Sequence, residues 1–296
     1  MATRDHKFTV PSRCELLPYL IGLPLGLSRK AAKDLLRFKA VSVKRINAVR
    51  HDTQLEPGDV VTIAAGKRAA TASAKRHGLK IVYLDDAIAV VDKPAGLLSM
   101  GSEAEKERTA HRILNEHLKA TTNSADQQAF IVHRLDRETS GLMMFARSRA
   151  IQAALQRDWK NVIKRYLAIV EGVPAKSDGT LRDNLVESKS MKMRRVAKGG
   201  EQAITHYRVL RTGRDNSLIE LTLETGRKNQ IRVQMAGLGH PIAGDRKYGA
   251  TTAPARRLAL HSCELKFRHP VSGASMDFRS ALPGRLMALI EPRARG

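Results

Sequence analysis

The sequence predicts an α+β fold: a large mixed, mainly antiparallel sheet, preceded by a small α+β domain. Segments that alternate polar and apolar residues indicate strands with one buried face, for example at residues 164–171 and 218–224. Segments with helical periodicity are few, which favours α+β over a regular α/β alternation. The 296 residues, 42% of them hydrophobic, suffice for two domains of unequal size. We therefore expect a first domain at residues 1–66, a linker at 67–79 and a large domain at 80–296.

The charge balance favours a polyanionic partner. Lys and Arg number 52 against 29 Asp and Glu, which gives a formal net charge of +23. Such an excess favours nucleic acid, whose phosphates release counterions on binding, with an anionic membrane surface as the alternative. No apolar run is long enough to span a bilayer, and the first residues lack the apolar core of a secretory signal. The two cysteines, Cys14 and Cys263, form neither a disulfide framework nor a metal-ligand cluster, so we expect a soluble, cytoplasmic protein.

The first domain is expected to contain a helix at residues 28–39, with Ser28 as its N-cap. This helix has an apolar face and a basic stripe. The stripe suits contacts with phosphates, and a merely solvated face is an equally weighted alternative. Residues 41–43 then indicate a short strand, and residues 55–63 a turn followed by a strand. The apolar face consists of Ala31, Leu35 and Phe38, and the basic stripe of Arg29, Lys33 and Arg37.

Three features of this domain resemble the RNA-binding module of ribosomal protein S-four type. They are Leu-Ser-Arg at the start of a basic helix, a Val-x-Val strand, and a closing Pro-Gly-Asp-Val-Val turn and strand. Val43-Lys44-Arg45 stands where the module usually has Val-Asn-Gly, so the hairpin departs from the pattern and gains positive charge. The resemblance implies that residues 1–66 bind RNA. Residues 67–79 are small, polar and basic without an acidic residue, which is typical of a flexible linker.

The large domain is expected to open with a hairpin at residues 81–84 and 88–91, followed by a turn at 93–97. A helix is predicted at 109–119, a polar loop at 121–128, strands at about 130–134 and 141–147, and a helix at about 149–160. In the strands at 164–171 and 218–224, the side chains expected to share one face are Tyr166, Ala168 and Val170, and Ile219, Leu221 and Leu223.

The turn between residues 134 and 141 places one carboxylate, Asp136, between two arginines. Loops held on a rigid sheet are common places for chemistry, although an isolated Asp in a turn is more often a capping or salt-bridged residue. Farther along the chain, Thr225 or Asn229 is a candidate start for a helix that would hold Arg232 stiffly, within reach of a carboxylate. The buried side of that helix is expected to contain Ile231, Met235 and Leu238.

In combination, these segments resemble the RluA-type family of RNA pseudouridine synthases. The matching motifs are Lys-Pro-x-Gly at 93–96, His-Arg-Leu-Asp-x-x-Thr-Ser-Gly at 133–141, Tyr166, Gly-Arg-x-x-Gln-Ile-Arg at 226–232, and Gly-His-Pro-Ile-x-Gly-Asp at 239–245. The similarity covers about residues 80–280. Asn229 departs from the histidine that is common in the family, at a position that is not catalytic there.

The resemblance implies the pseudouridine synthase catalytic fold and an isomerase that breaks the N1–C1′ bond of uridine, rotates the base and rejoins it through C5. A carboxylate suits the positively charged sugar centre of such a reaction, as in glycoside hydrolysis. By resemblance, Asp136 is the nucleophile, acting at C1′ or on a sugar proton. Tyr166 would stack on the base and is the candidate for handling the C5 proton. Arg232 would favour and orient the Asp136 anion.

The resemblance also implies substrate-binding residues and a substrate class. Arg134 would fill the space left by the target base as it flips out of its stack, while Arg227 and Gln230 are candidates for substrate or phosphate contacts. Family members with the S-four-like module mostly act on large-subunit ribosomal RNA, so we expect ribosomal RNA first and transfer RNA second. We expect no metal, nucleotide or redox cofactor, no membrane partner, and a monomer.

Other functions fit parts of the same pattern. A non-catalytic RNA-binding or ribosome-assembly factor would retain the fold, and an N-glycosidase that releases uracil would share the carboxylate chemistry. The basic run at residues 189–198 is either an RNA-contacting loop or a solvated surface. His133 is expected to shape the Asp136 turn rather than to act as an acid or base.

Overall fold

The computed structural model describes residues 6–25, 29–37, 41–44, 50–63, 78–101, 105, 108–122 and 128–290. Packing divides the chain into two compact units: Met1–Leu79 with His111–Ala129, and Lys80–Ala110 with Phe130–Gly296. The domain limits expected from the sequence stay predictions. Of the expected linker at 67–79, residues 67–77 lie outside the described residues.

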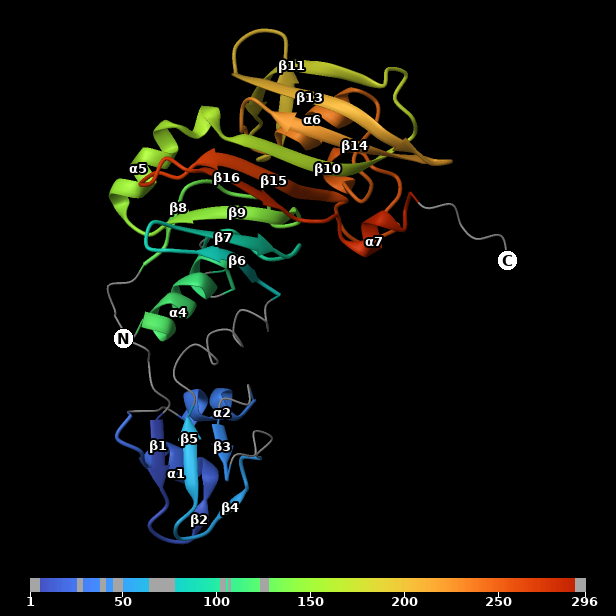
Figure 1. Ribbon diagram of the computed structural model, residues 1–296. Coiled ribbons are helices and arrows are strands. Elements are labelled where there is room, and N and C mark those ends of the chain that lie inside the picture. The colour runs from blue at the N-terminus through green and yellow to red at the C-terminus, as the bar shows by residue number, and fades with distance from the viewer. Residues whose placement is uncertain are drawn as a thin grey trace. The chain divides into compact units, whose positions relative to one another are not determined.

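The first unit contains two small antiparallel sheets and short helices (Figure 1). One sheet has the order β1-β5-β3, and in the other β2 pairs with β4. Leu16, Leu20 and Leu55 are fully buried in the apolar core of this unit. Its elements are β1 (His6–Thr9), β2 (Cys14–Glu15), α1 (Leu16–Gly22), α2 (Arg29–Arg37), β3 (Val41–Val43), β4 (Gln54–Leu55) and β5 (Val60–Ile63), with α4 (Ala110–Thr122) forming most of the segment His111–Ala129.

The predicted basic helix is present as α2, and Arg29 and Lys33 on it are exposed. Ser28 and Phe38 lie outside the described residues, as do the side chains of Ala31 and Arg37. The predicted strand at 41–43 is β3, and the one at the end of 55–63 is β5.

The altered hairpin position next to β3 is occupied by Lys44. This residue has φ of +50°, a left-handed conformation that Gly and Asn adopt more readily than Lys. Its Nζ lies 2.9 Å from Asp59 Oδ1, and Asp59 is buried. An ion pair with Asp59 therefore accompanies the left-handed backbone of Lys44.

The second unit is built around an 11-stranded mixed sheet, as the sequence predicts. Its main path has the order β12-β11-β13-β14-β10-β15-β9-β7-β6, and β16 and β8 pair with β15 and β9 (Figure 1). All its strand pairs are antiparallel except β15 with β9. The strands are β6 (Lys80–Leu84), β7 (Ile88–Lys93), β8 (Phe130–Ile131), β9 (Ser140–Ala146), β10 (Ile163–Glu171), β11 (Asp178–Glu187), β12 (Met193–Val196), β13 (Glu201–Thr212), β14 (Asn216–Leu223), β15 (Leu260–Arg268) and β16 (Ser275–Arg279).

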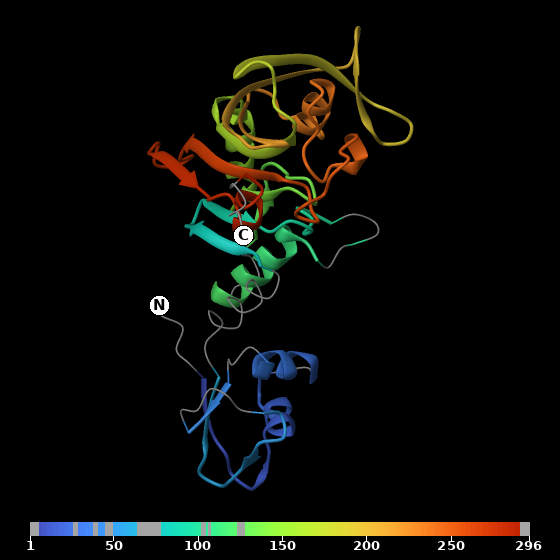
Figure 2. The same ribbon diagram turned by 90° about the vertical axis from the view of Figure 1, so that its right-hand side faces the viewer.

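Few helices accompany this sheet. Seen from the side in Figure 2, α6 lies beside the long curved strands at one end of the sheet, where it packs against β11 and β12. Helix α5 packs against β8 and β9, and β9 is buried along its whole length. The helical elements are α5 (Arg149–Arg157), the 3-10 turns η1 (Trp159–Asn161) and η2 (Arg246–Tyr248), α6 (Gln230–Gly237) and α7 (Gly284–Met287).

Several predicted boundaries differ from the structure. The strand expected at 130–134 is only β8, because residues 132–139 form the turn that carries Asp136. The helix expected at 149–160 ends at Arg157 and continues as a separate 3-10 turn. The basic run at 189–198 includes strand β12, which pairs with β11 and thereby places Arg194 and Arg195 on an edge strand rather than in a loop.

Gly141 is the point at which the Asp136 turn enters the sheet. It has φ of +111°, and a Cβ there would lie 2.1 Å from the carbonyl oxygen of Ser262. Any side chain would therefore separate β9 from β15, the one parallel pair of the described sheet. Glycine at this position permits the close contact on which the end of the turn rests.

Candidate active site

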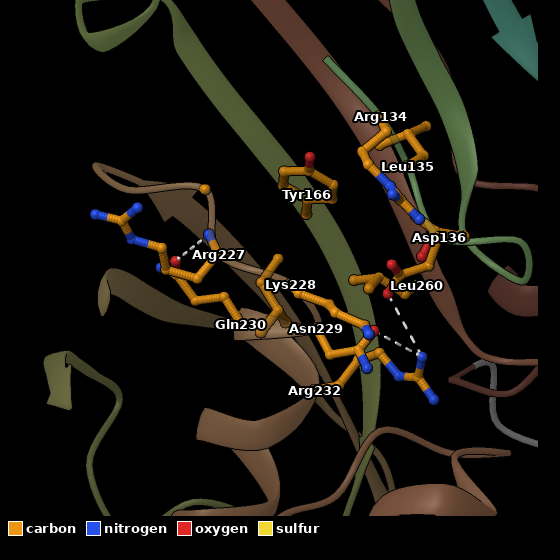
Figure 3. A pocket seen from close by; sticks show the side chains of 13 residues that line it. Arg134, Leu135, Asp136, Tyr166, Arg227, Lys228, Asn229, Gln230, Arg232 and Leu260 are labelled. Atoms are coloured by element: carbon orange, nitrogen blue, oxygen red, sulfur yellow. Dashed lines mark hydrogen bonds and ion pairs between the residues drawn. The ribbon is translucent and has the colours of Figure 1, made fainter. Parts of the chain in front are cut away.

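A pocket of about 190 Å³ lies where three segments of the second unit meet: the Asp136 turn, strand β10, and the loop and first turn of α6. Figure 3 shows Tyr166 between the Asp136 turn on one side and the segment with Arg227 on the other. The predicted site residues that line this pocket are Arg134, Asp136, Tyr166, Arg227, Gln230 and Arg232. The structure thus brings together six residues that span almost 100 positions of sequence.

Asp136 is half-buried at the pocket wall. From the residues that the structure describes, one hydrogen bond reaches its carboxylate, from Arg232 Nη1 to Oδ2 at 3.4 Å, which is long for a charge-assisted bond. The backbone carbonyl of Asp136 accepts from the amide of Thr139 at 3.1 Å, which closes the turn. An ionised carboxylate has about four lone-pair sites, so most of the acceptor capacity of Asp136 stays available to a ligand.

Arg232 is held mainly by a different carboxylate, that of Asp245. Its Nε and Nη2 each donate to one Asp245 oxygen at 2.7 Å, and Asp245 is 2% exposed. Nη1 also donates to Asn229 Oδ1 at 3.2 Å, and the guanidinium lies 5.0 Å from the centre of the Tyr248 ring. Burial alone would lower the pKa of Arg232, but Asp245 and Asp136 outweigh it and raise the pKa. The guanidinium is therefore a fixed cation aimed at Asp136.

Asn229 explains how α6 presents Arg232. It is the N-cap residue, as the sequence suggested, but its backbone is left-handed with φ of +52° and its side chain makes no capping bond. The side chain instead bridges Arg232 and the Tyr248 hydroxyl, to which Nδ2 donates at 2.9 Å. Ile231 and Met235 are buried as expected, whereas Leu238 follows the helix and is only half-buried.

The Asp136 turn is supported from behind by the segment that follows β7. Lys93, fully buried, donates from Nζ to the carbonyls of Leu97 at 2.8 Å, Pro94 at 3.1 Å and Arg137 at 3.2 Å. Ser99 exchanges two hydrogen bonds with the backbone of Leu135, at 2.6 and 3.0 Å. Burial lowers the pKa of Lys93 to about 7. Lys93 of the Lys-Pro-x-Gly motif thus fixes the backbone after Asp136, and Ser99, just beyond the motif, fixes the backbone before it.

Tyr166 lies on β10 at a bulge, where the pairing with β15 shifts register between Arg165 and Tyr166. It is 8% exposed, and what remains accessible faces the pocket. Burial, with a smaller effect of the Asp136 charge, raises the pKa of Tyr166 well above its usual range. The side chain is therefore a neutral phenol at physiological pH, able to stack and to donate a hydrogen bond.

Gln230 and Arg227 are tied into the protein around the pocket. The Gln230 amide nitrogen donates to the carbonyl of Ile204 and to Thr205 Oγ1, and its oxygen accepts from Thr225 Oγ1 and from the amide of Arg227. The Arg227 guanidinium binds Glu201 at 2.9 Å and the Gln202 carbonyl at 3.1 Å. These bonds shape the pocket wall. Whether either residue also contacts substrate stays a prediction.

Arg134 differs from the other arginines at the pocket. It is exposed, and it makes no hydrogen bond or ion pair with any residue that the structure describes. Such a side chain can move to follow a ligand. Arg29 and Lys33 belong to the other compact unit, and the Arg37 side chain lies outside the described residues.

His133, at the start of the turn, has the supporting role expected from the sequence. Its Nε2 accepts a hydrogen bond from the amide of Met144 at 3.0 Å, and its ring stacks on Trp159 at a centroid distance of 4.5 Å. Burial, with the nearby charge of Lys164, lowers the pKa of His133 to about 3. The ring is therefore neutral at physiological pH and serves as a fixed acceptor beneath the turn.

Sequence reasoning did not assign roles to Asp245, Lys93 or Tyr248, although two of them stand in the quoted motifs. A buried ion pair or a lysine beneath a turn has no distinctive spacing in a sequence. Only their positions within the motifs could have indicated Asp245 and Lys93, and Tyr248 lies outside the motifs. Among the described residues, no group of three or more His, Cys, Asp or Glu side chains is placed to hold a metal ion. In the same part of the chain, no helix is both long and apolar enough to cross a membrane.

Comparison with known proteins shows which family this chain resembles. A family model described as RNA pseudouridylate synthase matches residues 87–237. An uncharacterized RNA pseudouridine synthase of Bacillus subtilis, YlyB, is 34% identical over 251 residues, covering 83% of each chain. Ribosomal large subunit pseudouridine synthase D of Zymomonas mobilis is 32% identical over 291 residues, covering 92% of this chain and 91% of that protein. The solved structure of human RNA pseudouridylate synthase domain containing 4 is similar with a TM-score of 0.61 at 27% identity, covering 75% of this chain and 94% of that chain.

Proposed function

Because this chain belongs to the RNA pseudouridylate synthase family, we propose that it isomerises specific uridines in large-subunit ribosomal RNA with Asp136 as the nucleophile. The ribosomal assignment is supported by the relative from Zymomonas mobilis, whose name gives it a ribosomal large-subunit substrate and which aligns over 92% of this chain. Transfer RNA is the second candidate substrate. The observation that carries the catalytic proposal is the half-buried Asp136 carboxylate beside a fixed guanidinium.

The chemistry needs a carboxylate whose oxygens are free on the pocket side. As the N1–C1′ bond breaks, positive charge develops at the sugar, and a carboxylate stabilises it by adding to C1′ or by removing a sugar proton. The single 3.4 Å bond from Arg232 to Asp136 leaves these lone pairs open. Arg232 restricts the rotation of the Asp136 carboxylate and orients it. The uracil is released from C1′, turns over and attacks C1′ through its C5. In this step a bond from Asp136 to C1′ breaks, or Asp136 returns the sugar proton, and the C5 proton is then removed.

Tyr166 and Arg134 complete the proposed site. Tyr166 presents its ring to the pocket, where it can stack on the flipped uracil. As a neutral phenol it enters the reaction as a donor, and it can take the C5 proton only after giving up its own. The exposed Arg134 would occupy the gap that the flipped base leaves in the RNA, which offsets part of the unstacking cost of a few kcal/mol.

We further propose that residues 1–66 form an S-four-like RNA-binding domain, joined by a basic linker at 67–79 to a catalytic domain at 80–296. In support, the first unit has its own apolar core, and its helix α2 exposes Arg29 and Lys33. Basic side chains on one face of a helix suit phosphate contacts, which would add affinity without sequence information. We propose a monomer as the active form.

The test is tritium release from RNA that carries 5-tritiated uridine, with large-subunit ribosomal and transfer RNA pools assayed separately. Wild type should release tritium from the ribosomal pool, and Asp136→Asn should release less than about a thousandth as much while still binding RNA. Appreciable release by Asp136→Asn would contradict the nucleophile. Free uracil in the products would indicate a glycosidase. Binding without release from either pool by wild type would favour a non-catalytic assembly factor.

A further inference from the structure

A second pocket adjoins the first and shares Arg232 with it. It has a volume of about 640 Å³ and is formed mainly by the loops on either side of η2. Glu138, two residues after Asp136, lies at its margin, and Asp245 lies in its wall. Of the residues in the proposed catalytic site, Arg232 alone also lines this second pocket among the described residues.

The lining of this second pocket is strongly cationic. Besides Arg232 it contains Arg246, Lys247, Arg256 and Arg257. None of these four forms an ion pair with an acidic residue in the part of the chain that the structure describes. Elsewhere on this unit, cations are commonly paired, for example Arg165 with Glu264 at 2.7 Å and Arg208 with Glu220 at 3.0 Å.

The two carboxylates at the second pocket neutralise only part of this charge. Both oxygens of Asp245 accept hydrogen bonds from Arg232, and Glu138, which is exposed, lies 3.9 Å from Arg137 and acts electrostatically on Arg257. Among the described residues, four cations without an ion pair therefore share one exposed carboxylate. Like charges crowded on one wall repel one another, so the arrangement fits a ligand that brings negative charge.

One of these cations, Arg257, is held in place by hydrogen bonds, whereas Arg246, Lys247 and Arg256 are exposed. Arg257 is half-buried, and its guanidinium donates to Ser140 Oγ at 2.7 Å and to the carbonyls of Leu258 and Leu260. A Cβ on Gly244 would lie 2.2 Å from the Arg257 carbonyl oxygen, so the two loops meet closely at this glycine. Arg256, which is exposed, has φ of +52°, a conformation that costs a residue with a side chain about 1 kcal/mol or more. Backbone strain of this kind tends to occur at binding sites.

We propose that this second pocket seats a backbone phosphate of the RNA next to the target uridine, with Arg246 and Arg256 as its main ligands. The proposal rests on the proposed function, because it uses the sugar position which that function requires. If C1′ of the target nucleotide lies at Asp136, its flanking phosphates are attached to the same sugar. One of them then falls within a nucleotide's length of Arg232, at the boundary of the two pockets. Planar guanidinium groups bind phosphate oxygens in pairs, which suits this role better than binding a base edge.

The experiment compares Arg256→Asn, Arg246→Gln and the double variant with wild type. Asn tolerates the left-handed backbone at 256, so this substitution removes the charge without adding strain. The matched control is Arg214→Gln, an exposed arginine in the turn between β13 and β14 that lines neither pocket. The probe is a full-length large-subunit ribosomal RNA transcript labelled with 5-tritiated uridine. Its dissociation constant is measured over a series of salt concentrations, alongside kcat and KM for tritium release.

For the double variant we expect the slope of log affinity against log salt to flatten by about 0.7 to 0.9, the value of one phosphate contact. KM should rise about 10-fold or more with kcat within about twofold, because hydrogen bonds to a charged group are lost in ground and transition states alike. A raised KM with an unchanged salt-dependence slope would mean that the arginines contact bases. If both KM and the slope were unchanged, no phosphate would bind in the second pocket. Either result overturns the inference. No tritium release by wild type would overturn the proposed function instead, while the binding slope would still decide this inference.

Discussion

The Asp136 turn and the loop that ends at Asp245 each present a carboxylate to the same guanidinium, yet the two carboxylates are treated in opposite ways. Asp245 is buried and receives two hydrogen bonds of 2.7 Å from Arg232. Asp136 keeps 26% of its side chain exposed and receives one bond of 3.4 Å. One loop uses its carboxylate to fix the arginine, and the other offers its carboxylate to a ligand.

The difference shows how a reactive carboxylate can be both held in place and accessible. A lone Arg–Asp pair at Asp136 would either collapse into a tight bidentate bond or leave the arginine mobile. With Asp245, Asn229 and Tyr248 holding the guanidinium, only Nη1 extends toward Asp136. The backbone of the Asp136 turn is meanwhile fixed by Lys93 and Ser99. Asp136 is therefore positioned by a rigid arginine and a rigid backbone, and its own oxygens do not need to be saturated with hydrogen bonds.

The largest combined effect is expected for Asp245→Asn. The amide leaves a buried guanidinium without its counter-charge, and breaking such a pair costs about 3–5 kcal/mol. We expect the free energy of unfolding in urea to fall by about 3 kcal/mol and kcat by about 100-fold, because Arg232 is no longer aimed at Asp136. Asp136→Asn is the matched control: it should abolish turnover but change the unfolding free energy by less than about 1 kcal/mol. Equal destabilisation by both substitutions would show that the contrast between the two loops is wrong.

Tyr166→Phe sharpens the comparison by removing a hydroxyl opposite Asp136 while it keeps the ring. If the phenol takes part in proton transfer at C5, kcat should fall by about 100-fold with KM nearly unchanged. Tyr166→Leu should also raise KM, because base stacking contributes about 1–3 kcal/mol. Single-turnover formation of pseudouridine measures the chemical step. A Phe variant as fast as wild type would leave Tyr166 with stacking alone.

The pH dependence of stability tests how the Asp136 turn is held from beneath. His133 has its pKa lowered to about 3 from an ordinary value near 6.5, so the folded state prefers the neutral ring. The contribution of His133 to the free energy of unfolding is complete above pH 6.5 and is lost as the pH falls toward 3. At pH 4.5 the loss should be about 2–3 kcal/mol. Urea unfolding followed by Trp159, the single tryptophan, should show this loss in wild type and less of it in His133→Asn. In contrast, His206→Asn, at a half-buried histidine of β13, should leave the acid-induced loss of stability as large as in wild type. If His133→Asn lost as much stability in acid as wild type, His133 would not be the origin of the loss.

The smallest effect on turnover is expected from the basic helix of the first unit. Neutralising Arg29, Lys33 and Arg37 together to Gln should lower the salt dependence of RNA affinity by about 2 in slope, if each contacts one phosphate. The value of kcat should stay within about twofold, because neither Asp136 nor Asp245 is altered. Lys7→Gln, at an exposed lysine of β1, serves as the control. An unchanged slope in the triple variant would mean that the stripe is a solvated face.

Local patterns in the sequence were enough for most of the strands and for the residues of the pocket. Alternation in residues 164–171 predicted β10 and the inward position of Tyr166, because a strand has a period of two that packing does not change. The motifs at 133–141 and 226–232 were sufficient to identify Asp136 and Arg232 as candidate site residues. The boundaries were less certain: the expected strand at 130–134 shrinks to β8, because residues 132–139 bond to the Lys93 segment instead of to a neighbouring strand.

The amino-acid order alone therefore established the fold class, the family resemblance and which residues meet at the pocket. Only the tertiary structure decided which carboxylate each cation serves. Arg232 binds Asp245 at 2.7 Å and Asp136 only at 3.4 Å, and the other four cations of the second pocket form no ion pair among the described residues although Glu138 also lines that pocket. Ion pairing depends on the positions of charges to within about an ångström, and spacing along the chain carries no such information.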